Sequence, residues 1–287
     1  MKKRIVASIL LICIILSVLG CSKTDGDSYL KVTFIDVGQG DSALIECDGH
    51  FMLIDGGPKS AGDKVYSVLK ENGATKLDFL VISHMHEDHY GGLPKALKYV
   101  QKIEKILSNT AYAEGSFVST LHRWKKRIAV PKVDQEYDLG SAKVRVIENS
   151  NKDTNDSLVL LIEYGENRIL FTGDIQKSAQ QRIVEKYADS VSSLTDIPCK
   201  IDILKMPHHG AYNEYCAPDD STLYRFLWTF MPDHVVFSVG QNSYGHPSPE
   251  TLSLLNTRAW QPNIYSTLDD GDIVFISKNG KAIKQQE

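Results

Sequence analysis

Metal-binding side chains are concentrated in one short segment of the chain. Within six consecutive positions it carries His84, His86, Asp88 and His89. The segment directly follows the apolar run at residues 77–82, which predicts a buried strand because it is short and rich in branched and aromatic side chains. An exposed polar turn does not need imidazole and carboxylate groups at this density, whereas a cation such as Zn or Mn binds both. We therefore predict a metal site at the end of a strand.

The spacing within the segment indicates two metal positions. His84 and His86 are two residues apart in a near-extended stretch, so their side chains point the same way and can hold one ion. Asp88 and His89 follow where we expect the chain to turn into a helix that begins near Gly92, so they face a second position. We expect two adjacent divalent metal ions, Zn or Mn.

Flanking segments extend the pattern beyond this loop. The motif H-x-H-x-D-H resembles the signature of the metallo-β-lactamase superfamily. Further segments resemble the hydrolase domain of ComEC-type competence proteins and, more distantly, phosphorylcholine esterases; they are residues 34–42, 53–57, 171–174, 207–210 and 244–247. The resemblance covers about residues 29–280. It implies an α+β fold, a four-layer αββα sandwich, and metal-dependent hydrolysis.

The same resemblance implies roles for residues far from the loop. Asp174, at the end of a predicted strand, would bridge two metals, although an aspartate there could also be an ordinary helix N-cap. Of the pair His208 and His209, we favour His209 as a metal ligand and expect His208 to contact substrate oxygens. His246 is a further candidate, either for the remaining metal position or as a proton donor to the leaving group.

Two residues are expected to support the ligands, and one position departs from the superfamily pattern. Asp55 ends a predicted strand before two glycines, where it could be a simple turn residue, but the resemblance implies that it orients a ligating histidine. Superfamily members place another histidine in the middle of the chain, whereas this sequence has none between His122 and His208. Asn155 occupies that position in the ComEC-like pattern, and we expect it to support the ligands from behind.

We expect Asp88 to act both as a metal ligand and as a catalytic residue.

The first 28 residues predict export and anchoring. Basic residues at positions 2–4 precede an apolar stretch at positions 5–19, which is short for a membrane span. The stretch ends at Gly20-Cys21, similar to a bacterial lipobox, so residues 1–20 are predicted to be a lipoprotein signal peptide, with Cys21 lipidated. Residues 21–28 form a polar tether to a hydrolase domain at residues 29–287. An uncleaved transmembrane anchor is the alternative, and both place the domain outside the cytoplasmic membrane.

Charge gives little support for general nucleic-acid binding. The whole chain has 32 basic and 36 acidic residues, and three of the bases lie in the predicted signal peptide, which leaves 29 against 36 and a net charge of −7. A net acidic body does not attract a polyanion. One local basic run at residues 123–127 includes Trp124; a solvated helix face is favoured over a nucleic-acid contact for it.

The residue pattern favours hydrolysis with water as the nucleophile. No P-loop, nucleophile elbow or dinucleotide fingerprint competes with it. A phosphodiester is the leading substrate, because paired metals suit displacement at phosphorus; DNA, an envelope polymer and a small diester all remain open. A non-catalytic surface-binding lipoprotein and a thioester or lactam hydrolase are the alternatives. Nothing in the sequence indicates an obligate protein partner.

Overall fold

The computed structural model describes residues 28–111, 128–150, 156–188, 200–214, 217–256 and 260–286. The predicted signal peptide, Cys21, the basic run at 123–127 and Asn155 lie outside these residues. No helix in the described part of the chain combines the length and apolar character needed to cross a membrane.

Two sheets form the centre of the structure. In the described residues, the first sheet has the strand order β15 (Lys284–Gln286), β14 (Ile273–Lys278), β1 (Tyr29–Phe34), β2 (Ala43–Cys47), β3 (His50–Ile54), β4 (Lys76–Ile82), β5 (Lys102–Ser108) and β6 (Ile128–Ala129). The second has the order β13 (Asn263–Ser266), β12 (His234–Phe237), β11 (Ile203–Lys205), β10 (Asn167–Phe171), β9 (Leu158–Tyr164), β8 (Ala142–Asn149) and β7 (Glu136–Leu139). Both are mixed sheets, with parallel and antiparallel neighbours.

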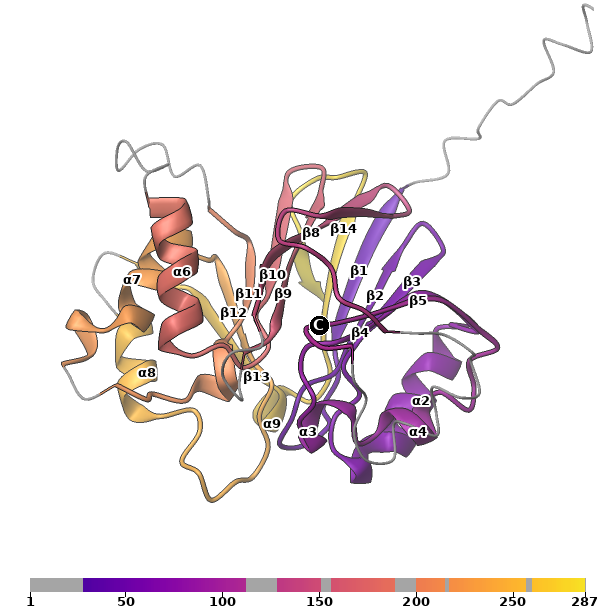
Figure 1. Ribbon diagram of the computed structural model, residues 1–287, viewed down its shortest axis with the longest axis horizontal. Coiled ribbons are helices and arrows are strands. Elements are labelled where there is room, and N and C mark those ends of the chain that lie inside the picture. Colours follow the sequence, from indigo (N-terminus) through magenta and orange to yellow (C-terminus); the bar gives the residue numbers. More distant parts are fainter. Residues whose placement is uncertain are drawn as a thin grey trace, which may run out of the picture.

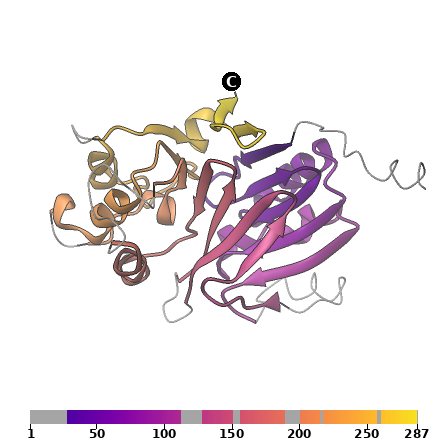
Figure 2. The same ribbon diagram turned by 90° about the horizontal axis from the view of Figure 1, so that it is seen from above.

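Helices cover the outer face of each sheet (Figures 1 and 2). Beside the first sheet lie η1 (Lys59–Ala61), α2 (Gly62–Glu71), α3 (Glu87–Tyr90) and α4 (Leu93–Ala96). Beside the second lie α6 (Lys177–Ala188), η2 (Pro207–Gly210), η3 (Pro218–Asp220), α7 (Thr222–Phe230) and α8 (Pro249–Leu255), while α9 (Thr267–Asp270) links β13 to β14. The predicted four-layer αββα sandwich is confirmed.

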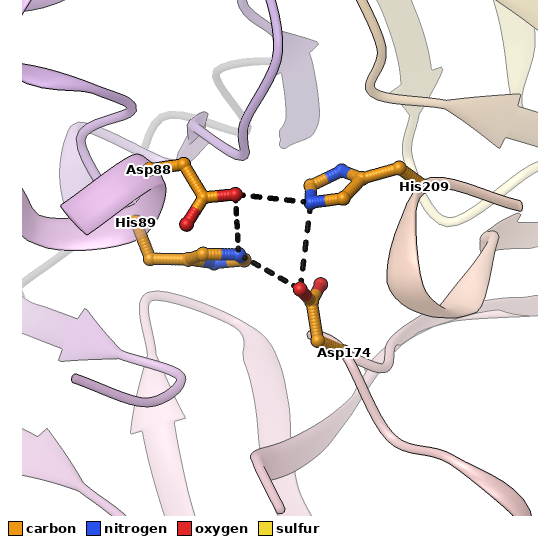
Figure 3. Close-up of side chains that lie close together, drawn as sticks. All are labelled: Asp88, His89, Asp174 and His209. Atoms are coloured by element: carbon orange, nitrogen blue, oxygen red, sulfur yellow. Dashed lines mark ion pairs between the residues drawn. The ribbon is translucent and has the colours of Figure 1, made fainter. Parts of the chain in front are cut away.

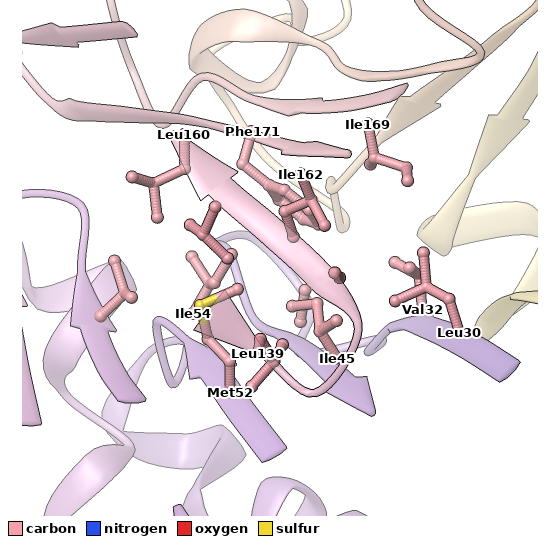
Figure 4. Close-up of a cluster of buried hydrophobic side chains, with 14 of the residues drawn as sticks. Leu30, Val32, Ile45, Met52, Ile54, Leu139, Leu160, Ile162, Ile169 and Phe171 are labelled. Atoms are coloured by element: carbon pink, nitrogen blue, oxygen red, sulfur yellow. The ribbon is translucent and has the colours of Figure 1, made fainter. Parts of the chain in front are cut away.

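Alternating side chains produce separate apolar cores, because successive residues of a strand point to opposite faces. In β2, Ile45 belongs to the core between the two sheets, whereas its neighbour Leu44 packs in the core beneath α2 and α4. In β9, Leu160 joins the inter-sheet core and Val159 the core beneath α6 and α7. The inter-sheet core therefore fixes the two halves against each other, as Figure 4 shows for residues from both sheets.

The strands that matter for function end at one edge of the sandwich. β3, β4 and β5 are parallel neighbours, as are β10, β11, β12 and β13. Since the carboxyl ends of parallel strands meet at the same edge of a sheet, the loops after β10, β11 and β12 lie together, and the packing of the two sheets places the loop after β4 against them. The helix expected near Gly92 is present as α4, but a separate short helix, α3, precedes it from Glu87, so Asp88 and His89 lie inside α3.

Candidate metal centre

Four side chains from three separate segments converge at this edge (Figure 3). Asp88 and His89 come from α3, Asp174 follows β10, and His209 lies in η2 after β11. One ligand atom from each of these residues lies within 4.8 Å of the others. Nε2 of His209 lies 3.4 Å from Oδ2 of Asp88 and 3.4 Å from Oδ2 of Asp174. A single cation could therefore contact all four residues.

Asp174 occupies the centre of a wider group of imidazoles. Its Oδ2 lies 3.3 Å from Nε2 of His89 and 3.9 Å from Nε2 of both His84 and His208. The ring of His84 is also close to the ring of His86, with centroids 4.3 Å apart. One oxygen thus faces histidines on both sides of the cluster, which is the position that a carboxylate shared by two cations needs.

The turn that carries His209 has an unusual backbone. Both His208 and His209 have left-handed conformations, with φ values of 48° and 55°. Gly210 follows with φ +84°, and a Cβ there would lie 2.5 Å from the Phe237 ring. Non-glycine residues adopt this region at a cost in energy, and such residues cluster at functional sites. The strained turn aims His209 into the cluster beside Asp174.

Buried partners fix the outer nitrogens of the histidines on the β4 side. Nδ1 of His89 donates to Oδ2 of Asp55 at 2.9 Å. Asp55 also accepts from the backbone and side chain of Ser83, at 2.8 and 2.6 Å. Oγ of Ser83 and Oγ of Ser157 lie 3.2 and 3.4 Å from Nδ1 of His84. Because hydrogen bonds at Nδ1 leave the lone pair on Nε2, both rings point a metal-binding atom at the cluster.

His209 is held in the same way from the other side. Its Nδ1 donates to the backbone carbonyl of Ser238 at 2.8 Å and lies 3.3 Å from Oδ1 of Asp41. Asp41 in turn forms an ion pair with the buried ammonium group of Lys205. The loop that carries Asp41 packs tightly on α3, since a Cβ on Gly40 would lie 2.3 Å from the carbonyl oxygen of Asp88. This loop, part of the segment 34–42, therefore borders the cluster directly.

Mutual electrostatics shift the pKa values of the buried groups in opposite directions. Burial opposes the charged form of His89 and His209, but the surrounding carboxylates together outweigh it, Asp174 with Asp55 for His89 and Asp174 with Asp41 for His209, and raise the pKa of both imidazoles well above the usual range. Burial also opposes ionisation of Asp174, yet His209 and His89 hold the pKa of that carboxyl well below its usual value. Burial, together with the nearby His89, lowers the pKa of His84, so this ring favours the neutral form that binds metals.

Several buried atoms in the cluster lack a hydrogen-bond partner among the described residues. They are Nε2 of His84, His89 and His209, and Oδ1 of Asp174. Buried polar atoms in native proteins are almost always paired, so imidazole nitrogens and carboxylate oxygens that converge without such partners are typical of a cation site. The donor set of imidazole nitrogens and carboxylate oxygens suits Zn or Mn. The residues present therefore fit the predicted divalent ions.

The cluster opens to solvent through a cleft of about 480 Å³. We call the four buried residues His84, His89, Asp174 and His209, each at most 2 % exposed, the floor. We call the more exposed residues that line the cleft, His86, Asp88, His208, Tyr244 and His246, the rim. Burial, reinforced by His208, lowers the pKa of His246 to about 4, so this ring is neutral near pH 7.

The structure brings most of the predicted site residues together. His84, His86, Asp88, His89, Asp174, His208 and His209 lie in or beside the cluster, and Asp55 lies directly behind it. His246 stands apart from the group that could hold one ion: its ring centroid is 5.5 Å from that of His208, and it lines the cleft. Its two predicted roles stay predictions, as does the role of Asn155, which lies outside the described residues.

Sequence reasoning missed Lys205, and it included Asp41 only as part of the segment 34–42. Lys205 ends the apolar strand β11, immediately before the Pro207–Gly210 turn, and it is only 2 % exposed. A lysine inside an otherwise apolar run was the available signal, because buried lysines are rare unless they are paired.

Comparisons with known proteins agree with this geometry. The family model described as "Metallo-beta-lactamase superfamily" matches residues 35–225. The chain is 26% identical to ComE operon protein 3 of Bacillus subtilis, over 90% of this chain and 34% of the relative, and 30% identical to competence protein ComA of Neisseria gonorrhoeae, over 77% of this chain and 29% of the relative. It therefore spans about a third of the length of these curated relatives. Among solved structures, the metallo-beta-lactamase fold protein YhfI from Bacillus subtilis is similar, with a TM-score of 0.55 at 13% identity, over 87% of this chain and 100% of that one.

The chain belongs to the metallo-beta-lactamase superfamily, since the family model covers most of the described residues. It has the fold of that superfamily, and its resemblance to competence proteins is confirmed by the relatives above.

Proposed function

We propose that the protein is a phosphodiesterase that uses two divalent metal ions, Zn or Mn. Asp88, His89, Asp174 and His209 would hold one ion. His84 and His86 would hold the second, with Asp174 shared between the two. When bound, such ions lower the pKa of water and neutralise negative charge that develops on a phosphoryl group. The observation that carries the proposal is the convergence of the unpaired Nε2 atoms of His84, His89 and His209 on Oδ2 of Asp174.

The chain's own residues would act on the substrate from the rim. His208 and His246 line the cleft above the floor and lie close to each other, at 5.5 Å between ring centroids. His208 would donate a hydrogen bond to a phosphoryl oxygen. His246, neutral in the free protein, would take up a proton when the negatively charged phosphodiester enters the cleft and raises its pKa, and would pass that proton to the leaving group. The floor, closed off by Asp55 and Ser83, would exclude water from the side opposite the cleft.

The walls of the cleft favour a substrate with few charges. Among the described residues that line it, none is Lys or Arg, and Glu87 and Asp88 add negative charge. A long polyanion needs a track of basic side chains along its backbone. This supports a small diester or a diester of an envelope polymer over DNA. The naming of the relatives as competence proteins keeps a nuclease as the second outcome to test.

We also propose that the hydrolase domain works outside the cytoplasmic membrane, held by a lipid at Cys21. The support is the basic, apolar and Gly20-Cys21 pattern of the first 21 residues. Replacement of Cys21 by Ser should move the protein from the membrane fraction to the soluble fraction of the cell envelope. If the Cys21→Ser protein stays in the membrane fraction, a transmembrane anchor takes the place of the lipid.

Hydrolysis assays test the substrate directly. The purified protein, loaded with Zn or Mn, should cleave bis(p-nitrophenyl) phosphate and leave single-stranded DNA largely intact. Cleavage of the DNA at a comparable rate would replace the envelope assignment by a nuclease. Cleavage of thioesters or lactams alone would contradict the phosphodiester assignment. Loss of all turnover in His86→Ala would show that the metal cluster performs the reaction.

A further inference from the structure

Lys205 is a buried cation that stands directly behind the metal cluster. Its Nζ forms an ion pair with Asp41 and lies 3.7 Å from Oδ1 of Asp174. Its side chain is 3 % exposed, so water does not screen these contacts. A lysine is among the least favourable residues to bury, and removal of one partner from a buried pair leaves an uncompensated charge. Its placement beside a predicted divalent metal site therefore needs an explanation.

The contacts of Lys205 connect the segments that carry Asp174 and His209. Nζ of Lys205 donates to the carbonyl oxygen of Gly173 at 3.2 Å, and the hydroxyl of Thr172 donates to the Lys205 carbonyl at 2.8 Å. The same Gly173 carbonyl accepts the backbone N–H of His208 at 3.1 Å. One side chain thus joins the loop after β10 to the turn after β11.

The ion pair also reaches both buried histidines through Asp41. Oδ1 of Asp41 lies 3.3 Å from Nδ1 of His209, and Oδ2 lies 3.9 Å from Nδ1 of His89. Asp41, Asp55 and His89 could themselves hold a cation, but the ammonium group of Lys205 already occupies the Asp41 side of that group. The ammonium group of Lys205 keeps Asp41 ionised and in one position. In that position the Asp41 oxygens face Nδ1 of His209 and Nδ1 of His89.

We infer that Lys205 is a positioning residue that holds Asp41 and Asp174 in place and thereby sets the affinity of the cluster for divalent metal ions. The inference rests on the proposed metal site. Lys205 is not itself a metal ligand. It controls the positions of the Asp174 carboxylate and of His209.

Two physical effects predict opposite changes in metal affinity when the charge of Lys205 is removed. If Lys205 acted only through its charge, its loss would strengthen metal binding, because a cation near the site repels another cation. If it positions Asp41 and Asp174, its loss weakens metal binding, because mutation of the partners that orient ligands costs about 10–100-fold in affinity. The sign of the change therefore separates positioning from simple electrostatics.

The test is a Zn²⁺ titration of the full-length, chelator-treated protein and its Lys205→Met variant. We expect Lys205→Met to bind Zn²⁺ about 10–100-fold more weakly than the wild type, and Co²⁺-loaded samples to show an altered visible spectrum. The matched control is Lys200→Met. Lys200 lies just before β11 and is also ion-paired, with Asp233 at 2.8 Å, but it is half exposed. Its loss should leave Zn²⁺ affinity and the Co²⁺ spectrum unchanged.

A double variant keeps the test valid if Lys205→Met folds poorly. Asp41→Asn/Lys205→Met removes both buried charges together, so the fold should recover, with a Tm above that of Lys205→Met. Its Zn²⁺ affinity should lie between those of Lys205→Met and the wild type. Equal or tighter Zn²⁺ binding in both variants would overturn the role of Lys205 while leaving the metal site intact. Absence of Zn²⁺ binding in the wild type would overturn the proposed function as well.

Discussion

The floor and the rim of the site are built from the same residue types but are supported differently. Floor histidines have their outer nitrogens bound by buried partners, such as Asp55 for His89 and the Ser238 carbonyl for His209. The rim histidine His246 has its backbone held by Asn242, at 2.7 and 3.1 Å, while Nδ1 of its ring has no partner among the described residues. Ligand orientation depends on such outer contacts. The difference indicates that the floor is suited to bind metal, whereas the ring of His246 at the rim is suited to contact substrate.

The largest expected effect comes from the centre of the floor. Asp174→Asn should lower kcat/KM for bis(p-nitrophenyl) phosphate by at least about 10³-fold, or ~4 kcal/mol, and should remove most of the bound metal. The reason is that Oδ2 of Asp174 faces imidazoles on both sides of the cluster. Steady-state kinetics and elemental analysis of the same sample measure both quantities. Full metal content in this variant would contradict a shared carboxylate.

A rim substitution should separate turnover from metal binding. His246→Asn is expected to lower kcat by about 10²-fold, the scale of a lost general acid, with metal content unchanged. A parallel loss of metal would move His246 from the rim into the ligand set, its other predicted role. Kinetics with a diester that has a more acidic leaving group provide the control, since such a substrate needs less help from a proton donor and should lose less activity.

Loss of the Asp55 contact behind the floor should have an effect of intermediate size. Asp55→Asn is expected to weaken metal affinity by about 10–100-fold, because an amide is a weaker acceptor for the ring N–H of His89. Asp55 has φ 57°, a conformation that Asn tolerates well, so the variant should keep its fold. Circular dichroism checks the fold, and a Zn²⁺ titration measures the affinity. Unchanged affinity would mean that this buried contact only stabilises the protein.

The smallest effect is expected at the mouth of the cleft. Tyr244 is 74 % exposed and its ring lies 5.8 Å from that of His246. Tyr244→Ala should raise KM for an aryl diester by a factor of about 3–10, because a ring contact contributes about 0.5–1.5 kcal/mol, while kcat stays nearly constant. Initial-rate measurements with an alkyl diester are the control, since that substrate offers no ring to stack. An equal rise in KM for both diesters would exclude stacking.

The sequence predicted the residues of the cluster better than the residues that hold them in place. His84, His86, Asp88 and His89 are adjacent along the chain, so their proximity needed no knowledge of the fold. Asp174 and His209 were named because their segments resemble the superfamily pattern, and each follows one of the parallel strands β10 and β11, whose carboxyl ends lie at one edge. By contrast, nothing local shows that Lys205 faces Asp41, since that contact depends on how the two sheets pack.

The short helix inside the metal loop, α3, was missed for a related reason. Gly92 and Pro94 are strong local signals and do mark the start of α4. The turn at Glu87–Tyr90 carries no comparable cap, and no side chain caps it in the structure. It is held instead by contacts with distant segments, such as the amide of Gly56 donating to the carbonyl oxygen of His89 at 2.6 Å.

The most direct test of the account is the metal content of the purified protein. Elemental analysis of the wild-type chain should find close to two divalent transition-metal ions per molecule. The His84→Ala/Asp174→Asn double variant, checked for its fold by circular dichroism, should retain almost none. A wild-type chain without metal, or a double variant with the same metal content as the wild type, would contradict the central claim.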